Sequence, residues 1–213
     1  MFHPGGGCVS IWRAATRDSS GVKNTVKCQC ERKIMEIKEL IKDAYEIIPV
    51  IRKDERGIFV KTFNADFFRE KGLETDFREE YYSVSRKNVL RGMHFQLSPH
   101  DLAKLVYCLK GRVLDVITDL RRNSPAFGKT ASLELSPKKA NMVYVPRGFA
   151  HGFYALEDDS LMLYKTTAVY SPEHDSGILW NSLDFKWPCD NPLISERDRG
   201  FPSLEEFLKR KIL

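Results

Sequence analysis

The 213-residue sequence lacks the features that mark several large classes of protein. No apolar run is long enough to span a bilayer, so we expect a soluble protein with no membrane partner. Residues 1–34 lack the apolar core of a secretory signal. There is no internal repeat and no low-complexity run. The length suits one domain with a substantial core.

An excess of charge of one sign is also missing from most of the chain. The net charge is +5, but residues 1–34 hold six Lys/Arg and two Asp/Glu, which leaves 28 basic and 27 acidic residues in the remainder. A nucleic-acid-binding protein gathers basic side chains on one face. The nearly neutral remainder therefore argues against such a face, and we expect no nucleic-acid partner.

Cysteine is too sparse and too unevenly placed for a disulfide framework. There are five cysteines, and three of them lie in residues 1–34. An odd count without regular spacing is typical of a reducing cytoplasm, which is the localisation we expect. Cys28 and Cys30 are closer together than the usual zinc ligands and have no histidine nearby.

Residues 1–34 show no hydrophobic period and contain a glycine run. We interpret them as a flexible tail or a non-native leader, with Met35 as the natural start. A segment that packs on a partner is the alternative. Residues 35–213 are then expected to form a single domain.

Short β segments predominate after residue 35, which favours an all-β sandwich or barrel. The clearest is a hairpin over residues 104–120 that turns at Lys110-Gly111. Other strand-like runs, most of them bounded by turn residues, are expected at 45–51, 58–63, 131–135, 142–145, 152–156 and 161–170. A short helix is expected at 65–72. A C-terminal helix is expected from the capping box Ser203-x-x-Glu206 to about Lys211.

The stretch VLRGMHFQ, Val89 to Gln96, carries the functional hypothesis. It is strand-like and places Arg91 three residues before His94, with Gly92 between them, where the backbone can bend or be approached closely. A guanidinium can clamp a phosphate, and an imidazole can move a proton near neutral pH. The pair suggests acid–base chemistry on a phosphorylated substrate, although a histidine in a strand is more often a hydrogen-bonded packing residue.

A second motif, Pro146-x-Gly148-x-x-His151, resembles the second signature of the cupins, a double-sheet jelly-roll family. The first cupin signature would need a His-x-His pair and a glutamate as metal ligands. In this sequence His94 is followed by Phe95 and Gln96. The ligand pattern is therefore missing, and we expect no metal site.

A closer resemblance is to the dTDP-4-dehydrorhamnose 3,5-epimerase family. The stretches VLRGMHFQ, KLVYCLKGRVLDVITDLRRNSPAFGK, VPRGFAHGF, LYKTTAVYSP, ILWN and LISERD occur in the family's order between about Asp54 and Asp198. Members of the family are metal-free homodimeric jelly rolls that invert C3 and C5 of a nucleotide-linked 4-keto-6-deoxyhexose. The resemblance implies a cupin-type double-stranded β-helix, a homodimer without a cofactor, and a role in deoxysugar and surface-polysaccharide synthesis.

The resemblance also implies which residues act. His94 matches the base and Asp198 the carboxylate that orients it. Tyr164 matches the acid on the opposite face of the sugar, and Lys104 the cation at the enolate. The residues expected to bind substrate are Arg91, at the diphosphate, and Arg56, Phe59, Lys61, Ser83, Gln96, His151 and Tyr170 around the rest. Each residue also has a purely structural interpretation, but their joint order favours the functional one.

Two departures from the family leave the nucleotide and the number of inverted centres open. Glu79-x-Tyr81 stands where the family has Gln-x-Asn, and Phe59-x-Lys61 stands where it has Phe-x-Glu. A carboxylate accepts the N3 hydrogen of thymine, whereas a lysine donates to N3 or O2 of cytosine. The alternatives are a single-centre epimerase, a relative specific for a CDP-sugar, and a non-catalytic sugar-binding jelly roll.

Overall fold

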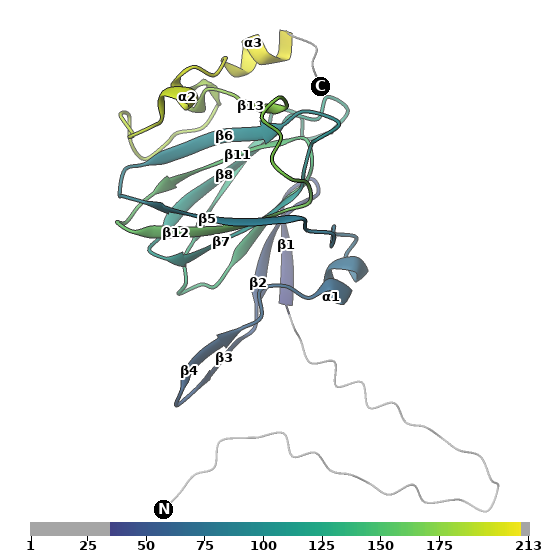
Figure 1. Cartoon of the computed structure of the whole chain (residues 1–213), viewed down its shortest axis with the longest axis vertical. Helices are drawn as coiled ribbons and strands as arrows, with labels where there is room; N and C mark the ends of the chain where they lie inside the picture. Colours follow the sequence, from purple (N-terminus) through teal and green to yellow (C-terminus); the bar gives the residue numbers. More distant parts are fainter. Residues whose placement is uncertain (1–34, 210–213) are drawn as a thin grey trace, which may run out of the picture. The chain divides into compact units, whose positions relative to one another are not determined.

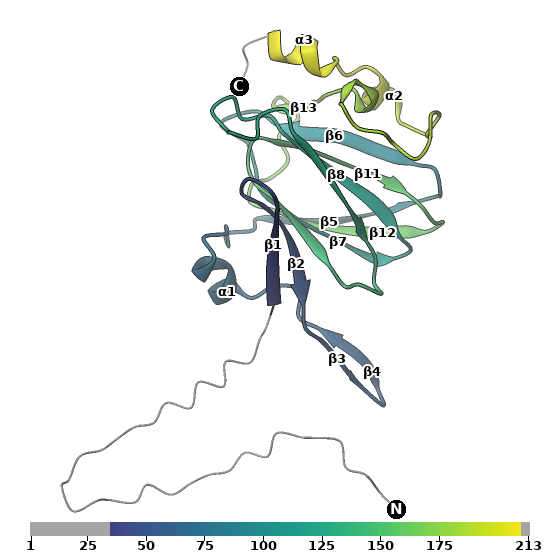
Figure 2. The same cartoon turned by 180° about the vertical axis from the view of Figure 1, so that it is seen from behind.

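The computed structural model describes residues 35–209, whose strands form two antiparallel sheets that face each other (Figure 1 and, from behind, Figure 2). The predicted tail or leader, residues 1–34, lies outside the described residues. No helix of the described part is long and apolar enough to cross a membrane. The facing sheets form the predicted jelly roll, so the expected fold class is confirmed.

The first sheet has six strands in the order β1-β2-β10-β7-β12-β5. These strands are β1 (Met35–Ile41), β2 (Ala44–Pro49), β10 (Met142–Val145), β7 (Lys104–Lys110), β12 (Ser160–Thr166) and β5 (Glu79–Ser85). Strand β5 pairs with β12 and forms one edge of the sheet. Strand β5 is therefore hydrogen-bonded to the rest of the sheet along one side only.

The second sheet has five strands in the order β13-β6-β11-β8-β9. These strands are β13 (Asp175–Gly177), β6 (Leu90–Gln96), β11 (Phe149–Ala155), β8 (Val113–Asp119) and β9 (Thr130–Leu135). Strand β6, which carries VLRGMHFQ, lies between β13 and β11. The hairpin predicted over residues 104–120 is wrong: both strands form, but β7 pairs with β10 and β12 and β8 with β11 and β9, so the chain crosses from one sheet to the other at Lys110-Gly111.

Alternation along the strands fills the space between the sheets with apolar side chains. One cluster of buried residues draws on both sheets, with contributions from Val106, Val143, Met162, Ile117 and Phe153. Because successive side chains point to opposite faces, the neighbours of these residues cover the outer faces. The interior is therefore apolar at one end and, as described below, hollow and polar at the other.

The outer faces of both sheets are covered by segments that connect or follow the strands. Helix α1 (Ala65–Glu70), capped by the Asn64 side chain, packs Phe68 on the six-stranded sheet. Beyond β13, the 3-10 turn η1 (Trp180–Ser182), helix α2 (Glu196–Arg199) and helix α3 (Leu204–Lys209) follow in order. Residues of this region, Trp180, Trp187 and Phe207, pack on the five-stranded sheet. Each sheet is therefore covered on both its inner and its outer face.

Most predicted elements are present, with different boundaries. The capping box is confirmed, because Ser203 and Glu206 exchange backbone-to-side-chain hydrogen bonds at the start of α3. Strand β12 ends at Thr166 and β4 at Val60, earlier than predicted, because the chain leaves the sheet at both points. Strands β1, β3, β5 and β13 and helix α2 were not predicted from the sequence.

A small two-stranded sheet stands apart from the jelly roll. Strands β3 (Ile51–Asp54) and β4 (Gly57–Val60) pair with each other and with neither larger sheet. Figures 1 and 2 show this hairpin extending beyond the end of β2. Its apolar side chains Ile51, Ile58 and Phe59 are exposed.

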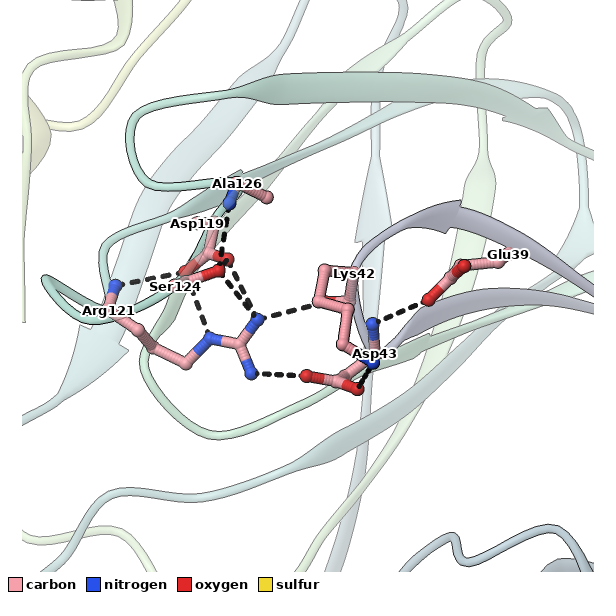
Figure 3. A network of polar contacts seen from close by, with 7 residues as sticks. All are labelled: Glu39, Lys42, Asp43, Asp119, Arg121, Ser124 and Ala126. Carbon is pink, nitrogen blue, oxygen red and sulfur yellow. Dashed lines mark hydrogen bonds and ion pairs between the residues drawn. The ribbon is translucent and has the colours of Figure 1, made fainter.

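An ion-pair network ties the two sheets together at one end (Figure 3). Arg121 donates to both carboxylate oxygens of the buried Asp119, at 3.0 and 2.8 Å, and to Asp43 at 2.9 Å. Asp119 ends β8, whereas Asp43 lies in the turn between β1 and β2. Burial alone would raise the pKa of Asp119, but hydrogen bonds from Arg121 and Ser124 hold that pKa below its usual range.

We predict that Arg121→Met lowers the free energy of unfolding by about 3 kcal/mol, because it leaves the buried Asp119 carboxylate without its cation. The matched control is Arg112→Met, which removes exposed ion pairs to Glu134 and Glu157 and should cost less than about 1 kcal/mol. Denaturant unfolding measures both.

The Arg121 effect should also depend on pH. Since the folded-state pKa of Asp119 is depressed, its contribution is present above the unfolded-state value of about 4 and is lost as pH falls through the folded-state pKa. The difference between wild type and Arg121→Met should therefore shrink in acid. Equal costs for the two variants at neutral pH would contradict the prediction.

Candidate functional site

A cavity of about 410 Å³ opens between the two sheets. Three of the four predicted catalytic residues line it, namely His94, Lys104 and Tyr164. Five of the predicted binding residues also line it, namely Ser83, Arg91, Gln96, His151 and Tyr170. The fourth predicted catalytic residue, Asp198, borders a neighbouring cavity of about 490 Å³ that shares His94 and Arg91 with the first. The structure therefore brings together nine of the twelve predicted site residues.

An irregularity in β6 puts Arg91 and His94 on the same side of the sheet. In the pairing of β6 with β11, His94 lies opposite His151 and Arg91 opposite Phe153, so three residue steps on β6 match two on β11. Such a bulge reverses the alternation of side chains. Gly92 permits it, because its φ is +147° and a Cβ there would stand 2.6 Å from Cα of Gly152.

His94 and Asp198 form a hydrogen-bonded pair. His94 Nε2 lies 2.9 Å from Asp198 Oδ1, and Asp198 Oδ2 accepts the Gly92 N–H at 3.2 Å. Burial lowers the pKa of His94, and the carboxylate of Asp198 opposes that effect. Burial alone would raise the pKa of Asp198, but the His94 and Gly92 hydrogen bonds keep it below its usual range. The site therefore holds a neutral imidazole beside an ionised carboxylate.

Short local structure holds Asp198 in place. The residue lies in α2, whose N-cap is Ser195, and the Ser195 hydroxyl accepts the Asp198 N–H at 3.1 Å. A parallel bridge between Val89 and Leu193 joins this segment to the start of β6. The carboxylate is thus fixed against the strand that carries His94.

Lys104 is the first residue of β7 and points into the cavity. It alternates with Leu105, which packs on the outer face of the six-stranded sheet. Its Nζ donates to the backbone oxygen of His94 at 3.2 Å. Burial lowers the pKa of Lys104 to about 8, against the attraction of Asp115 and Asp175. The side chain is therefore mainly a cation at neutral pH.

Tyr164, in the middle of β12, is buried at the wall of the cavity opposite β6. Its hydroxyl lies 3.3 Å from Ser83 Oγ. Burial raises the pKa of Tyr164 strongly, so the phenol keeps its proton across the physiological range. Because β12 belongs to the six-stranded sheet and β6 to the five-stranded sheet, Tyr164 and His94 come from opposite walls.

A second histidine–carboxylate pair lies deeper in the interior. His151 Nε2 is 2.9 Å from Oδ2 of Asp115, and both side chains are buried. The other oxygen of Asp115, Oδ1, is buried without a hydrogen-bond partner. Burial raises the pKa of Asp115, while His151 and Lys104 oppose the shift.

The remaining predicted binding residues have different surroundings. Arg91 is exposed, and its Nε donates to Ser85 Oγ at 3.0 Å. Gln96 holds two loops together, since its amide donates to the His100 oxygen and its oxygen accepts the Ser171 N–H, both at 2.7 Å. The backbone N–H of Tyr170 donates to Glu79 at 2.8 Å.

Three predicted binding residues lie outside the cavity of their own chain. Arg56, Phe59 and Lys61 belong to the β3–β4 hairpin or follow it directly, and all three are exposed. Arg56 pairs with Asp54, 2.6 Å away, on the hairpin itself. Within one chain these residues therefore lie away from His94, and their predicted role stays a prediction.

Several residues at the site were not identified from the sequence. Asp115 and Arg197 belong to matched stretches, and a carboxylate inside the apolar run of β8 was a signal for the first. Arg197 lines both cavities and pairs with Asp175 at 3.0 Å. Its position next to Asp198 was the available signal. Glu79 and Tyr81, noted as departures from the family pattern, also line the cavity.

No group of three or more His, Cys, Asp or Glu side chains within residues 35–209 is arranged to hold a metal ion. Two free cysteines, Cys108 and Cys189, lie in the same part of the chain. The site is built from proton-transfer groups and cations.

Comparisons with known proteins agree on one family. The family model described as dTDP-4-dehydrorhamnose 3,5-epimerase matches residues 38–206. A relative named dTDP-4-dehydrorhamnose 3,5-epimerase from Shigella flexneri is 42% identical over 165 residues, which cover 76% of this chain and 91% of the relative.

Two solved structures extend the comparison. The rmlC epimerase of Mycobacterium tuberculosis superposes with a TM-score of 0.81 at 38% identity, covering 84% of this chain and 93% of that one. The dTDP-6-deoxy-D-glucose-3,5-epimerase of Legionella pneumophila, solved in complex with dTDP-4-keto-L-rhamnose, gives a TM-score of 0.76 at 36% identity, covering 80% and 93%.

The His94–Asp198 pair can be tested without any assumption about chemistry. We predict that Asp198→Asn lowers the pKa of His94 further, because it removes the negative charge that favours the imidazolium. An NMR titration of labelled histidines, assigned with His94→Ala, measures this. Asp175→Asn is the control, since Asp175 lines the same cavity without contacting His94 and should leave that pKa in place. An unchanged pKa in Asp198→Asn would contradict the prediction.

Proposed function

Because this chain belongs to the dTDP-4-dehydrorhamnose 3,5-epimerase family, we propose that it is an isomerase that inverts C3 and C5 of a dTDP-linked 4-keto-6-deoxyhexose, without metal or cofactor. The carbonyl at C4 acidifies the protons on C3 and C5. Removal of either proton gives an enolate, and reprotonation from the opposite face inverts the centre. The reaction needs a base, an opposed acid and a cation at the enolate oxygen.

One observation carries this proposal: a neutral histidine and a protonated tyrosine line one cavity from opposite sheets. His94 is the base. With Asp198 accepting the Nε2–H, Nδ1 carries the lone pair that takes the proton, and the Asp198 charge stabilises the resulting imidazolium. Tyr164 delivers a proton to the other face, and its high pKa keeps that proton available.

Lys104 supplies the positive charge for the enolate oxygen. It is buried, charged at neutral pH and close to His94. A preorganised cation in a water-poor cavity stabilises a developing oxyanion more than it would in water. His151, held by Asp115, lies beside His94 in the sheet register and lines the sugar end of the cavity together with Tyr170.

The diphosphate is proposed to bind at Arg91. A guanidinium bonds phosphate oxygens through two parallel N–H groups, and Arg91 is exposed and lines both cavities. Ser83 and Gln96 complete the predicted binding set from the chain itself. We also propose the cytoplasm as the location, since the two cysteines of residues 35–209 are free thiols.

The first test follows solvent hydrogen into the sugar. In deuterated water the wild-type protein should place two deuterons, at C3 and C5, in each turned-over dTDP-4-keto-6-deoxyglucose. His94→Ala should lower this exchange by about 10²- to 10⁴-fold, because a positioned acid–base group contributes that much. His100→Ala, a histidine outside the cavity, is the control and should leave exchange unchanged.

The same experiment separates the alternatives. One deuteron per sugar would indicate a single-centre epimerase, and no exchange at any protein concentration would indicate a binding protein. Near-normal exchange in His94→Ala would mean that another residue is the base. Replacing dTDP by CDP in the substrate tests whether Lys61, in place of a carboxylate, selects cytosine.

We further propose that the protein is a homodimer in which the β3–β4 hairpin of one chain reaches the cavity of the other. Arg56, Phe59 and Lys61 lie outside the cavity of their own chain, and the hairpin exposes three apolar side chains to solvent. A second chain would cover these apolar groups and bring the predicted base-binding residues to a substrate.

Mixing two inactive variants tests this arrangement. We expect that His94→Ala and the triple variant Arg56→Ala, Phe59→Ala, Lys61→Ala are each impaired alone. Co-refolding them in equal amounts should restore about a quarter of the wild-type activity, because half of the dimers are mixed and each mixed dimer has one complete site. Absence of rescue, or a monomer by sedimentation, would contradict the proposal.

A further inference from the structure

Tyr81 contacts the proposed acid directly. Tyr81 and Tyr164 are cross-strand neighbours in the pairing of β5 with β12. Their rings lie 4.8 Å apart between centroids, with planes inclined by only 14°. Both line the cavity, yet Tyr81 is 44% exposed and Tyr164 only 6%. Tyr81 therefore forms a cover over one face of the Tyr164 ring.

A second residue on the same face of β5, Ser83, contacts the hydroxyl group of Tyr164. Residues 79, 81 and 83 alternate along the strand, and all three line the cavity. Tyr81 stacks on the ring of Tyr164, while Ser83 Oγ lies 3.3 Å from its hydroxyl oxygen. Ring and hydroxyl are thus held by two residues of one edge strand.

We propose that Tyr81 is a positioning residue that fixes the ring of Tyr164 for proton delivery. The inference rests on the proposed function, in which Tyr164 protonates the enolate. Parallel stacking restricts rotation of the Tyr164 ring about its χ angles and keeps water from one of its faces.

The proposal predicts a change in how the enolate is partitioned. His94 takes a proton from C3 or C5 and leaves an enolate. If His94, after exchange with solvent, returns a deuteron to the same face, the sugar is labelled without inversion. If Tyr164 delivers the proton to the other face, the centre inverts, and the phenolate then regains a proton from solvent. The ratio of the two outcomes therefore depends on Tyr164 and not on substrate binding.

The experiment measures that ratio in deuterated water at early times. The amount of deuterium in the unepimerised substrate is divided by the amount of epimerised product formed. This ratio is compared between the wild type and Tyr81→Ala. We expect the ratio to rise by about 2- to 10-fold in Tyr81→Ala, the range of an aromatic pair contact. Tyr81→Phe keeps the stack and should stay within about twofold of wild type. Tyr82→Ala, on the opposite face of the same strand, is the matched control and should not change the ratio.

Each outcome is decisive for one of the two proposals. If Tyr81→Ala lowers labelling and inversion together, with the ratio unchanged, Tyr81 is only structural and the inference is overturned. If Tyr164→Phe also leaves the ratio unchanged, Tyr164 is not the acid and the proposed function fails at that residue. Tyr81→Leu retains apolar bulk without stacking, so it gives the same test if Tyr81→Ala does not fold.

Discussion

The close contact of Gly92 with Gly152 is the constraint on which the site depends. A normal strand would put Arg91 and His94 on opposite faces, because they are an odd number of positions, three, apart. The bulge in β6 turns both into the cavity, and only a residue without a Cβ can lie against Gly152 at that point. Asp198 then bonds both the Gly92 N–H and the His94 ring, so one irregularity sets the positions of Arg91, His94 and Asp198 together.

Burial is the second determinant, and it acts on every ionisable group at the centre of the cavity. Desolvation is the largest influence on the pKa values of His94, Lys104, Asp115, Tyr164 and Asp198. What distinguishes these groups is their partners. Asp198 accepts two hydrogen bonds and stays ionised, whereas Asp115 keeps one unpaired oxygen and its pKa rises. The carboxylates of two similar histidine–carboxylate pairs thus have pKa values shifted in opposite directions, because their hydrogen-bond partners differ.

Local features of the sequence predicted much of this arrangement. The two strands within residues 104–120, the capping box at Ser203 and the bend at Gly92 depend on near neighbours, and all are found. Features that depend on distant pairing were not predictable. The stack of Tyr81 on Tyr164 follows from the register of β5 with β12. The hairpin prediction for β7 and β8 was wrong because their partners are strands distant in the sequence. The location of Lys61 outside the cavity of its own chain is a third example, because sequence order does not reveal which cavity an exposed hairpin faces.

The position of β5 at the edge of its sheet has a consequence for redesign of the enzyme. His94, Lys104, Asp115 and Asp198 lie on interior strands or on elements packed against them, where a change of side chain disturbs neighbours on two sides. Glu79, Tyr81 and Ser83 face the same cavity from a strand with a single neighbour. A library at Glu79 alone would reshape the pocket at the edge strand, whereas changes at Tyr81 and Ser83 would also alter how Tyr164 is held. The edge strand is therefore the natural starting point for altering which sugar the cavity accepts.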